Sequence, residues 1–369
     1  MQGASSIFQK AVKPGSLPAA LRRAKLRAPF LPVIALTALA VVTTGSSTQA
    51  QEPAPFLLHA GVNEVIVPVT VTDNKGRFVS DLEQSDFHIF DEDKEQKIDF
   101  FSHQQSQPIV IGFLIDMSNR MKVNWDRYKE STTDLILSLI TGDPKSPKSS
   151  GYLITYGNEP ELVADTSPDS EAMVQKLRTM KPAGGSALFD AIYMACTRRK
   201  TVLGEPLQPR RIVIIIGDGH DSASKKTLQE AEEIAQRNLV TIYAMNTVAF
   251  GMHNDDEDNL RQLTSLTGGK VEAPLGANLY ADTRGYLSNP QDAGNYAIDV
   301  GTGGYTAELQ RAIYSAVSNL IGEITTQYVI RYHPDFGTDQ KLYRHVRVAV
   351  DLPTVTVRYR DGYYPFPVQ

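Results

Sequence analysis

Four oxygen-bearing side chains stand where a cation site can form. Each of them follows an apolar run or precedes a helical stretch, and they are Asp116, Ser118, Ser186 and Asp218. Carboxylate and hydroxyl oxygens are ligands that hard divalent cations prefer, and no soft ligand stands near them in the sequence. The residue types therefore predict a site for Mg²⁺ or Mn²⁺. A plainer interpretation is that the aspartates cap turns or helices, that Ser118 is the N-cap of the helix predicted to begin near Val123, and that Ser186 is the N-cap of the helix after it.

The elements around these residues predict how they meet. Three continuous apolar runs, typical of strands buried on both faces, occur at 109–115, 211–216 and 239–245. Helical stretches are predicted at 124–140, 170–180, 187–201, 225–237, 258–267 and 306–324, and 152–156 with 161–164 form a hairpin at one sheet edge. This alternation predicts an α/β fold with a doubly wound, mostly parallel sheet. Ligands bind such sheets at the carboxyl ends of the strands, which is where Asp116 and Asp218 stand.

Both flanks have period-two patterning. Residues 62–103 predict three or four antiparallel strands, and 327–333, 346–350 and 355–359 predict short strands near the other end. We expect the two ends to share one β-sandwich-like layer, with two independent β pieces as the alternative. The predicted domains are a signal peptide at 1–50, a β segment at 51–107, the α/β domain at 108–325 with a loop insertion at about 273–305, and a C-terminal β segment at 326–369.

The order of these motifs resembles the von Willebrand factor type A family. The matching features are an apolar strand followed by Asp-x-Ser, a Gly-Gly-Ser loop before Ala-Leu-Phe-Asp-Ala, and an apolar strand followed by Asp-Gly. The flanks, with Tyr328-Val329-Ile330-Arg331-Tyr332 and Asp361-Gly362-Tyr363-Tyr364-Pro365, look like the exported VWFA-related proteins of Acidobacteria. The resemblance implies a metal-ion-dependent adhesion site at Asp116, Ser118, Ser186 and Asp218, a protein partner whose carboxylate completes the metal shell, and no catalysis.

One position departs from that pattern. Arg120 stands where the family has a serine that ligates the metal. Its guanidinium can fold back against Asp116 or Asp218 and replace the ion, or it can point to solvent and leave a weak metal site. The first hypothesis is thus a non-enzymatic adhesion or interaction module with a degenerate metal site. The second is a metal-free structural or assembly protein that binds through its 273–305 loop or its β layer, and the third is an uncharacterised enzyme.

The segment from Ala273 to Tyr305 is rich in Gly, Asn, Asp and Tyr and has no clear periodicity. Tyr280, Tyr286 and Tyr296 are typical of a partner-binding loop, and a mobile surface insertion is the equal alternative. The acidic run 254–258 does not have EF-hand spacing, so we expect a solvated helix start there. His220 and Asp221 are expected to be exposed loop residues.

The charge distribution indicates export and argues against nucleic acid. The first fifty residues carry six basic side chains and no acidic one, followed by the apolar run from Phe30 to Val42 and the cleavage-like Thr48-Gln49-Ala50. The rest has 31 basic and 42 acidic residues, a formal charge of −11, which disfavours phosphate binding. We expect a periplasmic or secreted protein with an unknown protein partner and no membrane insertion after cleavage. The sequence contains no zincin His-Glu-x-x-His motif, no hydrolase Gly-x-Ser-x-Gly motif, no Walker loop and no dinucleotide-binding motif. Cys196 is the single cysteine, and we expect it to lie in a hydrophobic core.

Overall fold

The structure, a computed structural model, describes residues 64–103, 109–123, 125–141, 149–198, 209–247, 256–274, 301–335 and 342–365. The chain divides into two compact units, Met1–Phe56 and Leu57–Gln369, and every described residue belongs to the second. The predicted signal peptide and the tyrosines Tyr280, Tyr286 and Tyr296 lie outside the described residues. In the described ranges, none of the helices has the length and apolar character needed to cross a bilayer.

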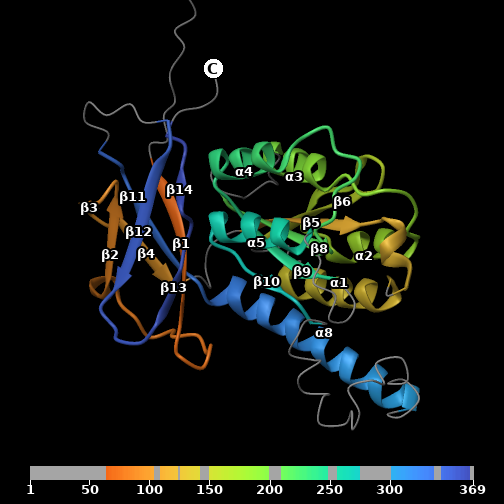
Figure 1. The fold of residues 1–369 in the computed structure, drawn as a ribbon. Helices are drawn as coiled ribbons and strands as arrows, with labels where there is room; N and C mark the ends of the chain where they lie inside the picture. Colours follow the sequence, from red (N-terminus) through yellow and green to blue (C-terminus); the bar gives the residue numbers. More distant parts are fainter. Residues whose placement is uncertain are drawn as a thin grey trace, which may run out of the picture. The chain divides into compact units, whose positions relative to one another are not determined.

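A six-stranded sheet forms the centre of the α/β domain (Figure 1). Its order is β10-β9-β8-β5-β6-β7, and only β7 is antiparallel to its neighbour. The strands are β5 (Ile109–Asp116), β6 (Ser149–Tyr156), β7 (Pro160–Ser167), β8 (Arg210–Gly217), β9 (Val240–Asn246) and β10 (Val271–Glu272). All eight residues of β5 are buried, as its uninterrupted apolar run predicts. The winding reverses between β5 and β8, which makes their carboxyl ends a switch point.

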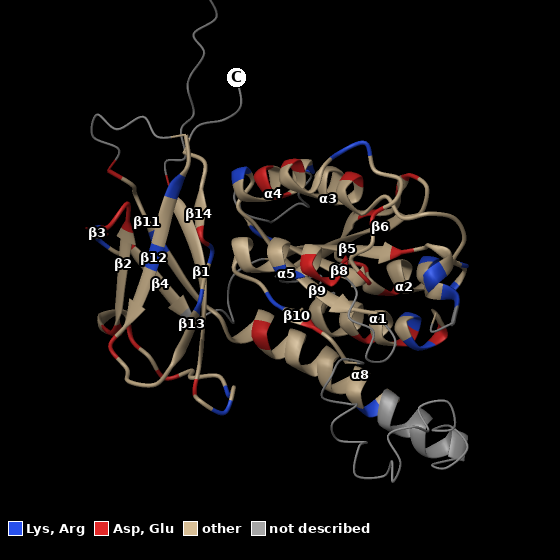
Figure 2. Cartoon of the chain, in the orientation of Figure 1, with Lys and Arg blue, Asp and Glu red and all other residues tan. Residues whose placement is uncertain are grey.

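Helices cover both faces of this sheet and account for its two cores. They are α1 (Trp125–Leu139), α2 (Ser170–Arg178), α3 (Leu188–Thr197), α4 (Leu228–Arg237), α5 (Asp256–Thr267) and α8 (Gly301–Thr326), with a 3₁₀ turn η3 (Asn119–Val123) before α1. One core takes side chains from α1, α2 and α8, and the other from α3, α4 and α5. Cys196 is fully buried in the second core, as expected. Most charged side chains lie on helices and loops rather than along the central strands (Figure 2).

Two tyrosines of β6 lie across glycines of other strands of this sheet. A Cβ on Gly112 of β5 would stand 2.4 Å from the Tyr152 ring, and one on Gly217 of β8 would stand 2.1 Å from the Tyr156 hydroxyl. Both tyrosines are buried, and real Cβ atoms do not approach so closely. These glycines are therefore required by the packing of large side chains and not by backbone conformation.

The flanking segments form two four-stranded sheets around a third core, which confirms the predicted fold class. Their orders are β13-β1-β11-β4 and β14-β12-β2-β3. The strands are β1 (Val65–Thr72), β2 (Phe87–Asp91), β3 (Lys94–Gln96), β4 (Phe100–His103), β11 (Tyr328–Tyr332), β12 (Arg344–Val350), β13 (Thr356–Arg358) and β14 (Gly362–Tyr363), and a 3₁₀ turn η1 (Gln84–Asp86) precedes β2. β1 pairs with β11 and β2 pairs with β12, so each of the two sheets contains strands from both flanking segments.

A buried polar network links these strands to the α/β domain. The Gln327 side chain donates to the hydroxyls of Thr70 in β1, at 2.7 Å, and Tyr243 in β9, at 2.6 Å, and accepts from Arg210. Glu323 of α8, 2% exposed, pairs with Arg358 of β13. Arg210 begins β8 whereas Asp218 follows its other end, so this network lies at the opposite edge of the sheet from Asp218.

Candidate site at the carboxyl edge of the central sheet

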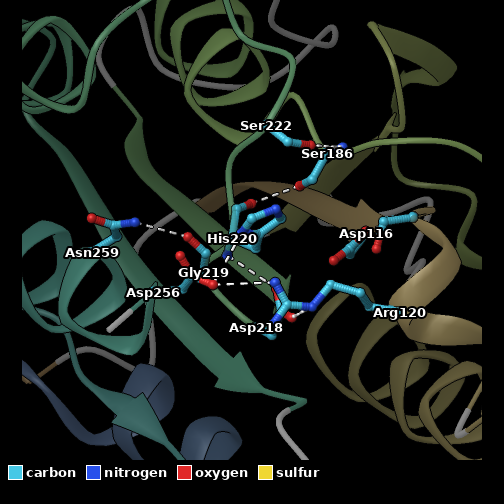
Figure 3. A network of polar contacts seen from close by, with 10 residues as sticks. Asp116, Arg120, Ser186, Asp218, Gly219, His220, Ser222, Asp256 and Asn259 are labelled. Atoms are coloured by element: carbon cyan, nitrogen blue, oxygen red, sulfur yellow. Dashed lines mark hydrogen bonds and ion pairs between the residues drawn. The ribbon is translucent and has the colours of Figure 1, made fainter. Parts of the chain in front are cut away.

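The structure brings the four predicted ligand residues to one edge of the sheet, and Figure 3 shows three of them, Asp116, Ser186 and Asp218. Asp116 ends β5, Ser118 lies two residues later, Ser186 precedes α3, and Asp218 follows β8. All four are buried, and the exposed fractions of the whole residues are 1%, 3%, 0% and 5% in that order. Because β5 and β8 are adjacent parallel strands, Asp116 and Asp218 meet at the switch point.

Asp116 lies in an environment that disfavours the ionised form of its carboxyl group. Burial raises the pKa of its carboxyl to about 6, and the charge of Asp218 also raises it. The backbone N–H of Ser118, which donates to Asp116 Oδ1 at 2.6 Å, works in the opposite direction, as does the positive charge of Arg120. The ionised form of Asp116 therefore depends on nearby donors and cations.

Ser186 is not the helix N-cap that its position predicts. The N-cap of α3 is Ala187, whose side chain makes no capping bond, and the Ser186 hydroxyl donates instead to the His220 carbonyl at 2.7 Å. The side chain of Asp221 caps the N-terminus of α3 instead, because its carboxylate accepts a hydrogen bond from the Phe189 N–H at 3.0 Å. His220 and Asp221 are thus half-buried structural residues of the site and not exposed loop residues. The loop after β8 and the loop before α3 are held together by these bonds.

Arg120 folds back into the site. Its Nε lies 2.8 Å from Asp218 Oδ2, and its Nη1 lies 3.1 Å from Asp256 Oδ2. Its side chain is 46% exposed, against 7% for Asp218 and 26% for Asp256. Of the two arrangements that the sequence allows, the structure has the one in which the guanidinium pairs with a site carboxylate.

Asp256 and His220 are the site residues that the sequence analysis missed. Asp256 begins α5, and its Oδ2 also lies 3.0 Å from His220 Nδ1, while the His220 N–H donates to Asp218 Oδ1 at 3.0 Å. The expectation of a solvated helix start at this acidic run was wrong for Asp256. Its sequence signal was only an acidic residue in a first helical turn, and nothing in the sequence indicated that α5 begins beside β8.

Two buried hydroxyls at this edge have no hydrogen-bond partner within the described part of the chain. They are Ser118 Oγ and the hydroxyl of Tyr156, at the end of β6. Ser118 therefore does not cap the helix after it. Burial, with the charges of Asp116, Asp218 and Asp221, raises the pKa of Tyr156 well above its ordinary value. Tyr156 is therefore a neutral hydroxyl close to the site carboxylates, and no role for it was predicted from the sequence.

The family of the α/β domain follows from comparison with known proteins. A family model of the von Willebrand factor type A domain matches residues 111–273, a range that contains Asp116, Ser118, Ser186 and Asp218. Residues 111–273 form a von Willebrand factor type A domain. Domains of this family often mediate protein interactions and are generally not enzymes. No curated protein matches the chain.

Several solved structures are similar to the chain at low identity. A von Willebrand factor type A protein from Catenulispora acidiphila is 12% identical, with 74% of this chain and 71% of that chain covered and a TM-score of 0.40. BatB from Bacteroides thetaiotaomicron is 14% identical, with 51% and 98% covered and a TM-score of 0.37. Proximal thread matrix protein 1 from the mussel byssus, described with a zinc-occupied MIDAS motif, is 16% identical, with 47% and 43% covered and a TM-score of 0.36.

Members of the family with a metal-ion-dependent adhesion site (MIDAS) motif bind divalent metals. The question is therefore whether the oxygen atoms at this edge are free to bind such an ion. Asp218 Oδ2 is occupied by the Arg120 guanidinium, and Asp116 Oδ1 by the Ser118 N–H. Across the described residues, no group of three or more His, Cys, Asp or Glu side chains is arranged to hold a metal ion. The arrangement of Arg120 and Asp218 does not fit a divalent cation, because the guanidinium occupies an oxygen that the ion needs and would repel it.

Proposed function

We propose that the protein is an exported, non-enzymatic interaction module that binds a protein partner at the carboxyl edge of its von Willebrand factor type A domain without a metal ion. Arg120 supplies the positive charge that a divalent cation supplies in metal-dependent members. This joins the adhesion hypothesis to the hypothesis of a metal-free site. Of the four residues of the degenerate metal site, Asp218 holds Arg120 directly, and the charge of Arg120 also acts on Asp116.

The ion pair of Arg120 with Asp218 is the observation that carries this proposal. The Arg120 guanidinium lies 2.8 Å from the carboxylate of Asp218, which is 7% exposed, so the two form a close ion pair in a partly desolvated place. Asp256 fixes a second nitrogen of the same group, so its orientation is set before any partner arrives. Pre-organisation of this kind lowers the entropy cost of binding.

The position of the site also supports a binding role. The buried contacts between the α/β domain and the β sheets involve Arg210, at the amino end of β8. Arg120 pairs with Asp218, which follows the carboxyl end of the same strand, so the site lies at the other end of β8 from these contacts. Almost half of the Arg120 side chain is exposed. Export is supported by the basic and apolar leader at 1–50 and by the extracellular occurrence of many domains of this family. The tyrosines at 280, 286 and 296 are proposed as additional partner contacts.

Capture from an extract of the organism that encodes the protein tests this function. The immobilised chain is presented with Mg²⁺ or with EDTA, and bound proteins are identified by mass spectrometry. We expect one set of partners in both buffers, lost from Arg120→Gln and kept by Lys122→Gln, a matched change at an exposed lysine of the same 3₁₀ turn. Partners that disappear in EDTA, or that survive Arg120→Gln, would contradict the proposal.

A further inference from the structure

We propose that Arg360 binds a small monovalent inorganic anion, of the chloride type, where the flanking β sheets meet the α/β domain. Arg360 lies between β13 and β14, and the whole residue is 1% exposed. It is one of the largest side chains buried to this extent among the described residues. The proposal is independent of the site at Arg120, and it depends on the hydrogen bonds, the charges and the burial around the Arg360 guanidinium.

Most of the hydrogen-bonding capacity of this guanidinium is unused within the described part of the chain. Nη2 lies 3.5 Å from the carbonyl oxygen of Val240, which is a long contact, while Nε and Nη1 are buried and have no hydrogen-bond partner there. A guanidinium carries five N–H donors and no acceptor, and a buried donor without an acceptor loses the free energy of its hydration. These nitrogens therefore need an acceptor that the described residues do not supply.

The charge of Arg360 is not compensated by any carboxylate in the ranges that the structure describes. Burial lowers the pKa of Arg360 to about 10, and the side chains that oppose this shift are the phenols of Tyr343 and Tyr332. Burial raises the pKa of both phenols above the ordinary value, so both are neutral at physiological pH. Arg360 is thus a cation at neutral pH, and a buried cation without a counter-charge is strongly unfavourable.

Two carboxylates of the same region are engaged with other groups. Asp91 is fully buried and accepts from Arg344 Nε at 2.7 Å and from two tyrosine hydroxyls at 2.9 and 2.8 Å. Asp361 follows Arg360 in the sequence, but its side chain is 51% exposed and accepts from the Tyr343 hydroxyl at 3.3 Å. Neither acid supplies the counter-charge, so it must come from outside the described chain.

The backbone around Arg360 is fixed against the α/β domain. The Asp361 N–H donates to the carbonyl of Leu266 in α5 at 3.1 Å, and a Cβ on Gly268 would stand 2.7 Å from the Arg360 nitrogen. Val240 begins β9, so the guanidinium reaches the amino edge of the central sheet, the edge opposite the candidate site. An anion on Arg360 would therefore stabilise the packing of the β sheets on the α/β domain.

Burial and charge decide which kind of anion fits. At 1% exposure, the side chain of a protein partner or a lipid headgroup cannot reach the guanidinium, so the ligand is a small ion that the folded chain encloses. Arg360 carries one positive charge, and no other described cation acts on it. A monovalent anion leaves the site neutral, whereas a divalent anion such as sulfate would leave a buried negative charge. A halide also accepts hydrogen bonds without needing to donate one, which matches a group that only donates.

Urea unfolding of the full chain, with chloride replacing gluconate stepwise at constant ionic strength, tests this inference. Gluconate is the reference anion because it is too large for an enclosed site. An ion that binds only the folded state raises the folding equilibrium constant about tenfold for each tenfold increase in its concentration above the dissociation constant. We expect this dependence in wild type, its loss in Arg360→Met, and its retention in Arg347→Met, a matched change at an exposed arginine of β12.

Two results of the unfolding experiment would overturn the proposal. They are equal stability of wild type in chloride and in gluconate, and the same chloride dependence in wild type and Arg360→Met. If Arg360→Met does not fold, crystals of wild type grown in bromide decide the question through the anomalous signal of that ion. We expect a bromide peak within hydrogen-bond distance of the Arg360 guanidinium. A water molecule at that position, with no bromide signal, would overturn the proposal.

Discussion

Replacing Arg120 by serine should create a divalent metal site. The substitution removes the guanidinium that lies 2.8 Å from Asp218 Oδ2 and frees that oxygen. It also places a hydroxyl at the position where metal-dependent members of the family have one. The remaining oxygens are in place, because Asp116, Ser118, Ser186 and Asp218 already gather at one edge, and Ser118 Oγ is buried with no partner in the described chain.

The size of the effect follows from the charge that is removed. An ion held by Asp218 would lie close to the guanidinium. At a separation of about 5 Å, a single and a double positive charge repel by about 2 kcal/mol in bulk water and by about 7 kcal/mol at an effective dielectric of 20. Since the Arg120 side chain is 46% exposed, solvent screening places the effect near the lower value. The expected gain in affinity is therefore about 30-fold or more.

Isothermal titration of Mn²⁺ and Mg²⁺ measures this gain. We expect binding to Arg120→Ser that exceeds binding to wild type and to Arg120→Lys, which keeps the positive charge. Adding Asp218→Ala to Arg120→Ser should remove the new site, and urea unfolding of each variant shows whether the fold is intact. Wild type that binds Mn²⁺ as tightly as Arg120→Ser, with the binding lost in Asp218→Ala, would refute the idea that Arg120 stands in for the ion.

Two further substitutions test the packing beside the site and a buried charge at the opposite edge of the sheet. Gly217→Ala should lower the free energy of unfolding by about 1–3 kcal/mol, because its Cβ would stand 2.1 Å from the buried Tyr156 hydroxyl; Tyr156→Phe in the same chain should restore most of the loss in urea unfolding, and an unchanged loss would contradict this cause. Burial raises the pKa of Glu323 above its ordinary value of 4.5 against the opposing charge of Arg358, so ionising it costs stability as the pH rises through and above 4.5. Unfolding between about pH 4 and pH 7 should therefore show Glu323→Gln gaining stability relative to wild type as the pH rises, and a constant difference would exclude Glu323 as the source.

The central sheet and the ligand residues were predictable from local patterns. Buried parallel strands leave uninterrupted apolar runs, and the residues after β5 and β8 must meet because adjacent parallel strands end at one edge. The pairing of strands from the two chain ends was also accessible, since neither flank has enough apolar surface to form a core alone. The short strand β14 was not predicted, because two residues are too few to show the alternation of apolar and polar side chains that indicates a strand.

The arrangement of the side chains in the site was not predictable from local patterns. Whether Arg120 folds inward depends on Asp256, which lies 136 positions away in the sequence and reaches the site only because α5 begins beside the loop after β8. Ser186 was predicted to be an N-cap from its neighbours alone, yet its hydroxyl prefers the His220 carbonyl that the fold places nearby. Local propensity cannot include a partner that tertiary packing supplies.

The charge balance of the site gives a reason why a cation of some kind stands there. Asp116 has a pKa of about 6 even with the Arg120 charge lowering it, so removal of that charge should raise its pKa further. Without a guanidinium or a metal ion, Asp116 would keep its proton to a higher pH than it does beside Arg120, and Asp218 would lose its charged partner. Metal binding to Arg120→Ser should therefore release protons, since the ion must displace the one on Asp116. A titration in buffers of different ionisation enthalpy would measure this release, and its absence would show that Arg120 does not set the charge of Asp116.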